Sequence, residues 1–104
     1  MQRLRTSLGQ LAGRFRRQPV TVADPFDTLR LQTRLGYLAT EIRRVENAPR
    51  IYARAHRLMA IEAAYDALLD EACRLAGVPE VDGLDGEDKR WSEEQELAAR
   101  GWTW

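Results

Sequence analysis

Two apolar repeats with helical spacing, separated by a proline, constrain this fold more than any other feature of the chain. The first repeat advances by alternating steps of four and three residues, through Leu31, Leu35, Leu38, Ile42 and Val45. Such spacing places every member on one side of a helix. Asp24 and Pro25 are typical of a helix start, because the aspartate can cap the first turn and proline needs no donor there. We therefore predict a helix over residues 25–46.

A second repeat follows Pro49, which lacks a backbone donor and interrupts the first helix. Its apolar positions are Ile51, Ala55, Leu58, Ile61, Tyr65, Leu68, Ala72 and Leu75. Gly77 and Pro79 end it, as a glycine cap followed by a proline stop. The sequence predicts a helix over residues 50–76, with Asn47 available as its cap.

Two helices with a short break between them can form an antiparallel hairpin or one kinked rod. A turn near residues 47–49 would bring Arg34 opposite Glu62. The same turn would bring Arg30 opposite Asp66, so that a basic stripe meets an acidic one. A kinked rod offers these stripes no partner within the chain, so the charges favour the hairpin, with each exposed pair contributing about 0–1 kcal/mol.

A second apolar row on the second helix widens the surface that must be covered. It comprises Tyr52, Met59, Ala63, Leu69 and Cys73. Together the two rows are wider than one partner helix can cover. Either an N-terminal helix fills the gap, or two hairpins pair into a four-helix bundle. The expected fold is all-α, and we favour a homodimer.

The 104 residues suffice for one domain with a modest core. We divide them into a basic amphipathic segment (1–22), a hairpin core (23–78) and an acidic, tryptophan-containing tail (79–104). Cys73 is the single cysteine, which excludes an intrachain disulfide and a multi-cysteine zinc site and indicates a reducing, cytoplasmic setting. We expect this cysteine to be a buried thiol rather than a nucleophile. Fifteen arginines against one lysine suggest a GC-rich, bacterial genome.

The net charge is zero, yet the two halves of the chain are oppositely charged. Residues 1–57 hold twelve arginines and four acids, whereas residues 58–104 hold twelve acids and four bases. Such asymmetry predicts a basic surface with an acidic partner, which the chain's own tail can supply. No apolar run approaches the ~20 residues that span a bilayer.

The first segment has one apolar helical face, formed by Leu4, Leu8, Leu11 and Phe15. Five arginines surround this face, and the first acid is Asp24. Docking on the hairpin is the interpretation we favour, because the hairpin has apolar surface to spare. An anionic membrane surface and an arginine-rich targeting peptide are the alternatives.

The tail predicts a last helix over residues 87–100, ending at Gly101. Trp91, Trp102 and Trp104 fall within fourteen residues of one another. Tryptophans of this kind either fold back on the bundle or anchor a partner. We keep both alternatives open.

The hairpin turn is a candidate site, because basic side chains gather there with Glu46 as the one acid. These are Arg43, Arg44, Arg50, Arg54, Arg57 and the single histidine, His56. Guanidinium groups bind phosphates by paired hydrogen bonds and by counterion release. The sequence therefore predicts a phosphate or nucleic-acid site here, against the alternative of a solvated helix end.

Arg50 and His56 stand in an Arg-x5-His spacing. This resembles the Arg-x4–6-His signature of the HEPN superfamily, all-α domains that often dimerise and many of which cleave RNA. The resemblance covers residues 50–56 and departs from the family at Ile51, where a polar residue is frequent. It implies that His56 would act as general acid/base and Arg50 would stabilise the phosphate transition state.

Other chemistry is not indicated by the pattern. Four carboxylates on the second helix lack the Glu-x-x-His pairs of a di-metal site, and pairing with arginine explains them better: Glu62, Asp66, Asp70 and Glu71. No phosphate loop or catalytic triad is present, and we expect no metal or cofactor. We interpret the chain as a small, non-enzymatic interaction or regulatory protein that binds a protein partner through its apolar face or tryptophan tail. Nucleic-acid binding at the turn is the alternative, and HEPN-like cleavage is a further one.

Overall fold

The computed structural model describes residues 24–48, 50 and 52–104, and its first described helix is α2, Pro25–Glu46. The carboxylate of Asp24 accepts a hydrogen bond from the N–H of Phe26 at 2.9 Å, which satisfies one of the free donors of the first turn. At the other end, the N–H of Asn47 donates to the carbonyl of Arg43 at 3.0 Å. The predicted bounds of this helix are confirmed.

The second helix, α3 (Arg54–Ala76), begins four residues later than the sequence predicts. Ala53 precedes it in the left-handed region, with φ 54° and ψ 41°, and Asn47 caps the end of α2 instead of the start of α3. A chain that reverses direction between antiparallel helices needs several non-helical residues, and the described residues 47, 48, 50, 52 and 53 are such residues. The predicted stop is confirmed, since Gly77 closes α3 with φ 77°.

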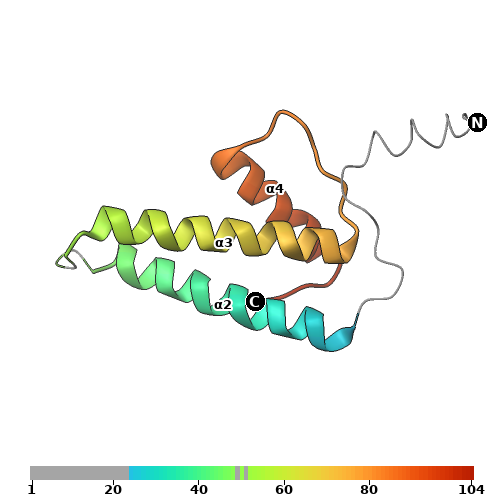
Figure 1. Cartoon of the computed structure of the whole chain (residues 1–104), viewed down its shortest axis with the longest axis horizontal. Coiled ribbons are helices and arrows are strands. Elements are labelled where there is room, and N and C mark those ends of the chain that lie inside the picture. The colour runs from blue at the N-terminus through green and yellow to red at the C-terminus, as the bar shows by residue number, and fades with distance from the viewer. Residues whose placement is uncertain (1–23, 49, 51) are drawn as a thin grey trace, which may run out of the picture.

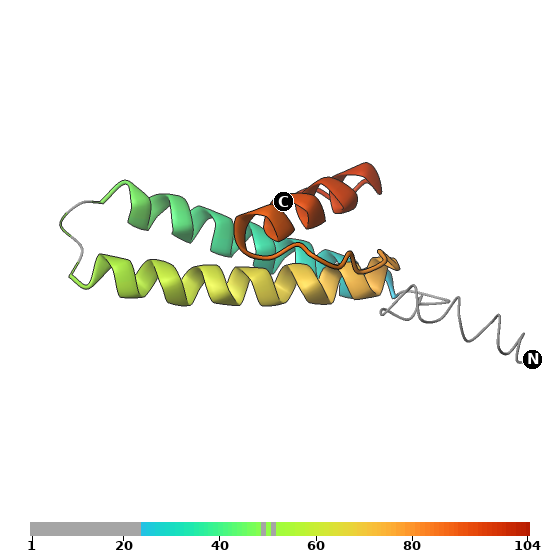
Figure 2. The same cartoon turned by 90° about the horizontal axis from the view of Figure 1, so that it is seen from above.

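α2 and α3 lie side by side and run in opposite directions, so the predicted hairpin is confirmed (Figure 1). The last helix, α4 (Gly86–Ala99), packs against α3 on one side of the hairpin, as both views show (Figure 2). Its bounds lie within one residue of those predicted. The part of the chain that the structure describes is therefore all-α, with no strand.

The core lies where the three helices and the C-terminal tail meet. It contains residues from the leucine repeat of α2, the inner face of α3, the loop after α3, α4 and the C-terminal tail. Its buried members are Leu31, Leu35, Tyr65, Leu68, Leu69, Ala72, Cys73, Val78, Leu97 and Trp102. Both predicted repeats therefore supply the core. The thiol of Cys73 is buried, as expected.

Cover for the second apolar row comes partly from α4. Leu69 and Cys73 belong to the same buried cluster as Leu97 and Trp102, whereas Tyr52 and Met59 stay exposed. The expected four-helix dimer is not needed to bury the C-terminal half of this row. An N-terminal helix, the other expected cover, would fall in residues 1–22, which lie outside the described residues.

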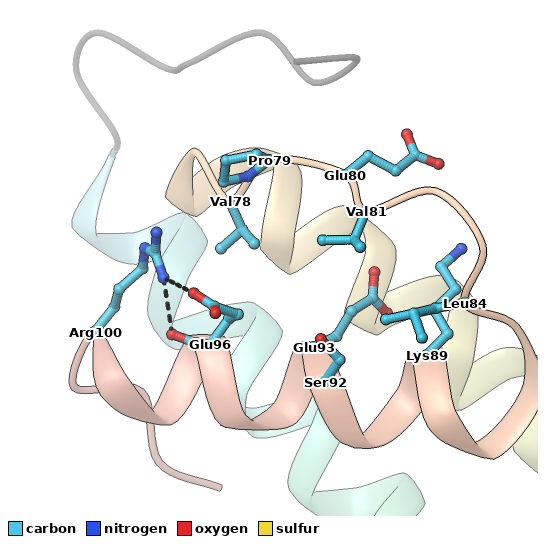
Figure 3. Close-up of a pocket in the computed structure, with 10 residues that line it drawn as sticks. All are labelled: Val78, Pro79, Glu80, Val81, Leu84, Lys89, Ser92, Glu93, Glu96 and Arg100. Carbon is cyan, nitrogen blue, oxygen red and sulfur yellow. Dashed lines mark hydrogen bonds and ion pairs between the residues drawn. The ribbon is translucent and has the colours of Figure 1, made fainter. Parts of the chain in front are cut away.

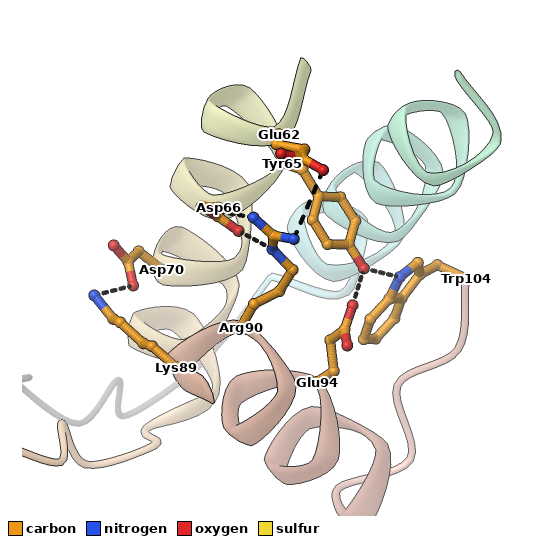
Figure 4. Close-up of polar contacts among 8 residues, drawn as sticks. All are labelled: Glu62, Tyr65, Asp66, Asp70, Lys89, Arg90, Glu94 and Trp104. Carbon is orange, nitrogen blue, oxygen red and sulfur yellow. Dashed lines mark hydrogen bonds and ion pairs between the residues drawn. The ribbon is translucent and has the colours of Figure 1, made fainter. Parts of the chain in front are cut away.

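The acidic stripe of α3 faces α4 rather than the arginines of α2, which corrects the predicted charge pairing (Figure 4). Arg90 holds Asp66 through two hydrogen bonds of 2.7 and 3.0 Å. Lys89 pairs with Asp70 at 3.3 Å, while Arg30 pairs with Asp27 on its own helix at 2.7 Å. The stripe thus positions α4, while the facing surfaces of α2 and α3 are joined by apolar contacts of the core.

None of the described helices combines the length and the apolar character needed to cross a membrane.

Candidate interaction surfaces

The arginine-rich turn is partly built into the fold. Arg54, the first residue of α3, donates from its Nε to the carbonyl of Val45 at 3.0 Å and from its Nη2 to that of Glu46 at 2.7 Å. These carbonyls belong to the last turn of α2, where no intrahelical donor remains and the helix dipole is negative. Arg54 therefore fastens the end of one helix to the start of the next.

Three other predicted arginines make local contacts. Arg57 donates to the carbonyl of Tyr52 at 3.1 Å, and Arg43 donates to the hydroxyl of Thr40 at 3.3 Å. Arg44 pairs with Glu41 at 2.9 Å, and this hydrogen bond lowers the pKa of the Glu41 carboxyl below its ordinary value. These three contacts lie on the surface, so the guanidinium groups stay accessible to solvent.

Arg50 is exposed in the turn that precedes α3, and His56 is exposed in the first turn of α3. The first turn of α3 contains no acidic residue, and the helix has no side-chain cap at Ala53. His56 and Arg57 therefore lie at the positive end of the α3 dipole, whereas Arg43 and Arg44 lie in the last turn of α2.

The tryptophan tail is divided between the core and the surface. Trp102 is buried, Trp104 is about one third exposed at 36%, and Trp91 is 64% exposed on α4. The chain end is tied to α2, because the N–H of Thr103 donates to Oε1 of Gln32 at 2.8 Å. Of the two alternatives for the tail, Trp102 and Trp104 fold back, and Trp91 stays on the surface.

Tyr65, on α3, connects this helix to α4 and to the C-terminal tail (Figure 4). Its hydroxyl donates to the carboxylate of Glu94 on α4 and accepts a hydrogen bond from the indole Nε1 of Trp104 at 3.0 Å. Burial raises the pKa of this phenol above its ordinary value, and the hydrogen bond to Glu94 raises it further. Next to it, the hydrogen bond to Asp66 raises the pKa of Arg90, which keeps its charge.

A shallow cavity of about 290 Å³ lies between α4 and the loop that follows α3 (Figure 3). Val78, Pro79, Val81 and Leu84 form its apolar side. An ion pair of 2.6 Å between Glu96 and Arg100 lies on the α4 side. The volume lies at the lower limit of ordinary small-molecule pockets.

The side of α2 that points away from α3 carries exposed apolar residues that the sequence analysis did not select. Phe26 is 74% exposed, Leu29 57% and Tyr37 65%. Because each residue turns a helix by about 100°, all three lie within one third of its circumference, opposite the buried Leu35. The signal was present as a second helical repeat on the opposite side of the helix from the leucine repeat. We call this surface the open face of α2.

Among the described residues, no group of three or more histidine, cysteine, aspartate or glutamate side chains is arranged to hold a metal ion. Three of the four α3 carboxylates, Glu62, Asp66 and Asp70, face the bases of α4.

Comparison of the chain with known protein families, with curated proteins and with solved structures finds no match.

Proposed function

We propose that this chain is a small interaction protein that binds a protein partner through the open face of α2, and that its function is binding rather than catalysis. The observation that carries the proposal is the exposure of Phe26, Leu29 and Tyr37 along one stripe. Monomeric proteins rarely expose a row of large apolar side chains, and aromatic residues flanked by arginine are typical of interface centres.

The tail supports this choice of surface. Trp102 lies in the core and Trp104 is hydrogen-bonded to Tyr65, so both tryptophans already contribute to the fold of their own chain. A partner that took them would have to open the junction of the helices. The open face of α2 needs no such rearrangement.

The test is photo-crosslinking from within the face. A photoreactive phenylalanine analogue replaces Tyr37, and a matched protein carries it at Gln95, which is exposed on α4. We expect adducts from position 37 and none from position 95 when each protein is irradiated in the cells that make it. The mass of the adduct identifies the partner as a second copy or another protein. Absence of any adduct from position 37 would rule out the proposal.

Binding of an anionic polymer at the turn is a second candidate. It is supported by the exposed basic side chains Arg50 and His56 beside a helix start that contains no acidic residue. Counterion release makes such binding steeply salt-dependent.

Fluorescence anisotropy of generic single-stranded RNA and DNA across a salt series tests this second candidate. We expect Arg50→Glu to weaken binding and Arg74→Glu, at the other end of α3, to leave it nearly unchanged. No binding at low salt would remove the candidate. If the RNA probe is cleaved, His56→Ala decides whether the HEPN-like motif is responsible, because loss of cleavage with retained binding is expected only in that case.

A further inference from the structure

A second helical repeat runs along the open face of α2, on the opposite side of the helix from the leucine repeat. Its members alternate in steps of four and three residues: Phe26, Arg30, Thr33, Tyr37, Thr40 and Arg44. All six are exposed in the structure. This is the spacing by which one helix packs lengthwise against another. None of the three described helices covers it.

The charged residues in and next to this repeat follow a self-complementary order. When a second copy of the helix is laid alongside in the opposite direction, acids meet bases. Toward the start of α2 an acid precedes a base, Asp27 and then Arg30, joined at 2.7 Å. Toward the end an acid again precedes a base, Glu41 and then Arg44, joined at 2.9 Å. The two groups lie at equal distances along the helix from a point between residues 35 and 36.

We propose that the open face of α2 pairs with the same face of a second copy, with the two helices antiparallel about a two-fold axis between residues 35 and 36. In this register Arg30 lies opposite Glu41 of the second copy, and Asp27 lies opposite its Arg44. A parallel pair would instead place Arg30 opposite Arg30, which is repulsive. The charge order therefore selects both the partner and the direction.

Aromatic residues fit the same register. Tyr37 lies next to the axis and opposite Arg34 of the second copy, an arrangement suited to a cation–π contact. Phe26 lies near the aliphatic part of the second copy's Arg44, where its exposed ring gains cover. The interface is thus isologous, with each contact made twice, as a two-fold dimer requires.

The size of the face predicts a weak dimer. From Phe26 to Arg44 the helix rises about 27 Å, at ~1.5 Å per residue. A single pair of helices of that length buries less than the roughly 800 Å² per partner of a standard stable interface. Reversible, concentration-dependent association is the expected behaviour.

This inference rests on the proposed function, since it names the partner of the same face. Sedimentation equilibrium over a wide range of concentrations tests it with charge reversals at Arg30 and Glu41. Arg30→Glu and Glu41→Arg each place like charges opposite one another at both ends of the interface. Each single change should weaken dimerisation roughly tenfold, because two attractive pairs become repulsive. The double variant R30E/E41R restores opposite charges and should recover the wild-type constant within about threefold.

Glu71→Arg is the matched control, because Glu71 is exposed on α3 and lies outside the proposed interface. Circular dichroism of every variant checks that helix content is retained. The proposed dimer is overturned if the wild-type protein stays monomeric at every concentration. It is also overturned if Arg30→Glu and Glu41→Arg leave the dimerisation constant unchanged. A monomer whose position 37 still crosslinks to another protein would overturn the dimer alone. Absence of all adducts would remove the proposed function with it.

Discussion

Arg54 shows how one side chain can serve the fold in a place where sequence alone indicates a binding site. Its two hydrogen bonds reach the carbonyls of Val45 and Glu46 in the last turn of α2, where intrahelical donors are lacking. It extends from α3 to α2 across a turn that begins at Asn47 and ends at Ala53. The sequence alone does not distinguish Arg54 from the other arginines at the turn, whereas the structure shows that its guanidinium group binds the carbonyls of α2.

Replacing Arg54 by alanine should lower the free energy of unfolding by about 1 kcal/mol, because the two carbonyls lose a charged donor. Urea denaturation measures the change. Arg50→Ala is the control, since Arg50 is exposed and should shift the midpoint little. Equal midpoints for both variants would contradict the structural role given to Arg54.

Tyr65 is the residue at which the tail, α3 and α4 meet. Tyr65→Phe removes a hydroxyl that serves both Glu94 and Trp104, and should cost about 1 kcal/mol of stability. Tyr37→Phe is the matched change at an exposed tyrosine and should stay within about 0.5 kcal/mol of wild type. Chemical denaturation of both variants gives the comparison, and similar losses for the two would refute the role of Tyr65.

The raised pKa of Tyr65 also predicts a dependence of stability on pH. An unfolded tyrosine loses its proton near pH 10, whereas the folded protein retains that of Tyr65 to a higher pH. Unfolding above about pH 10 therefore releases a proton, and the free energy of unfolding falls as the pH rises. The fall should be shallower in Tyr65→Phe. Identical slopes in denaturation series above pH 10 would argue against the buried phenol.

At the scale of helices, the sequence was sufficient where local chemistry decides the outcome. Asp24, Pro25 and the leucine spacing determine α2, and Gly77 determines the end of α3. The start of α3 was misplaced because the turn continues to Ala53, a residue with no strong preference for leaving a helix. Its left-handed backbone follows from the reversal of the chain, which is a tertiary requirement.

The partner of the acidic stripe was predicted wrongly for a different reason. Arg30 and Arg34 match the four-residue spacing of the stripe, whereas Lys89 and Arg90 are neighbours in the sequence, so spacing alone favoured the wrong partners. The useful signal was the isolation of Lys89 and Arg90 as adjacent bases in an otherwise acidic segment. The open face of α2 was not predicted, because its repeat mixes aromatic, charged and hydroxyl residues. The leucine repeat on the opposite side of the same helix is uniformly apolar and gives a stronger signal.

Arg90 should determine how firmly α4 is held. Arg90→Gln breaks the paired hydrogen bonds to Asp66 and should speed amide hydrogen exchange in α4 by roughly fivefold, which corresponds to about 1 kcal/mol. Arg100→Gln is the control, because its partner Glu96 lies within α4 itself. Equal exchange in the two variants would show that the stripe does not anchor α4.

For the whole molecule, the described ion pairs join residues of the same half rather than the two oppositely charged halves, and in the acidic half they involve α4. Its two bases neutralise carboxylates of α3, so the acidic half of the sequence partly neutralises itself. The basic half keeps exposed arginines at the turn and on α2. The open face of α2 combines arginine, acid and aromatic residues in the self-complementary order described above, and it is the central element of this account.

NMR spectra of isotopically labelled protein, recorded over a dilution series, test the pairing of two copies through the open face of α2 most directly. They map association without assuming a surface. We expect the signals of the open face to shift with concentration, led by Phe26, Tyr37 and the charged pairs beside them. Signals of α4 and of Glu71 on α3 should stay constant. Concentration-dependent shifts confined to α3, α4 or the turn, or no shifts at all, would contradict the account.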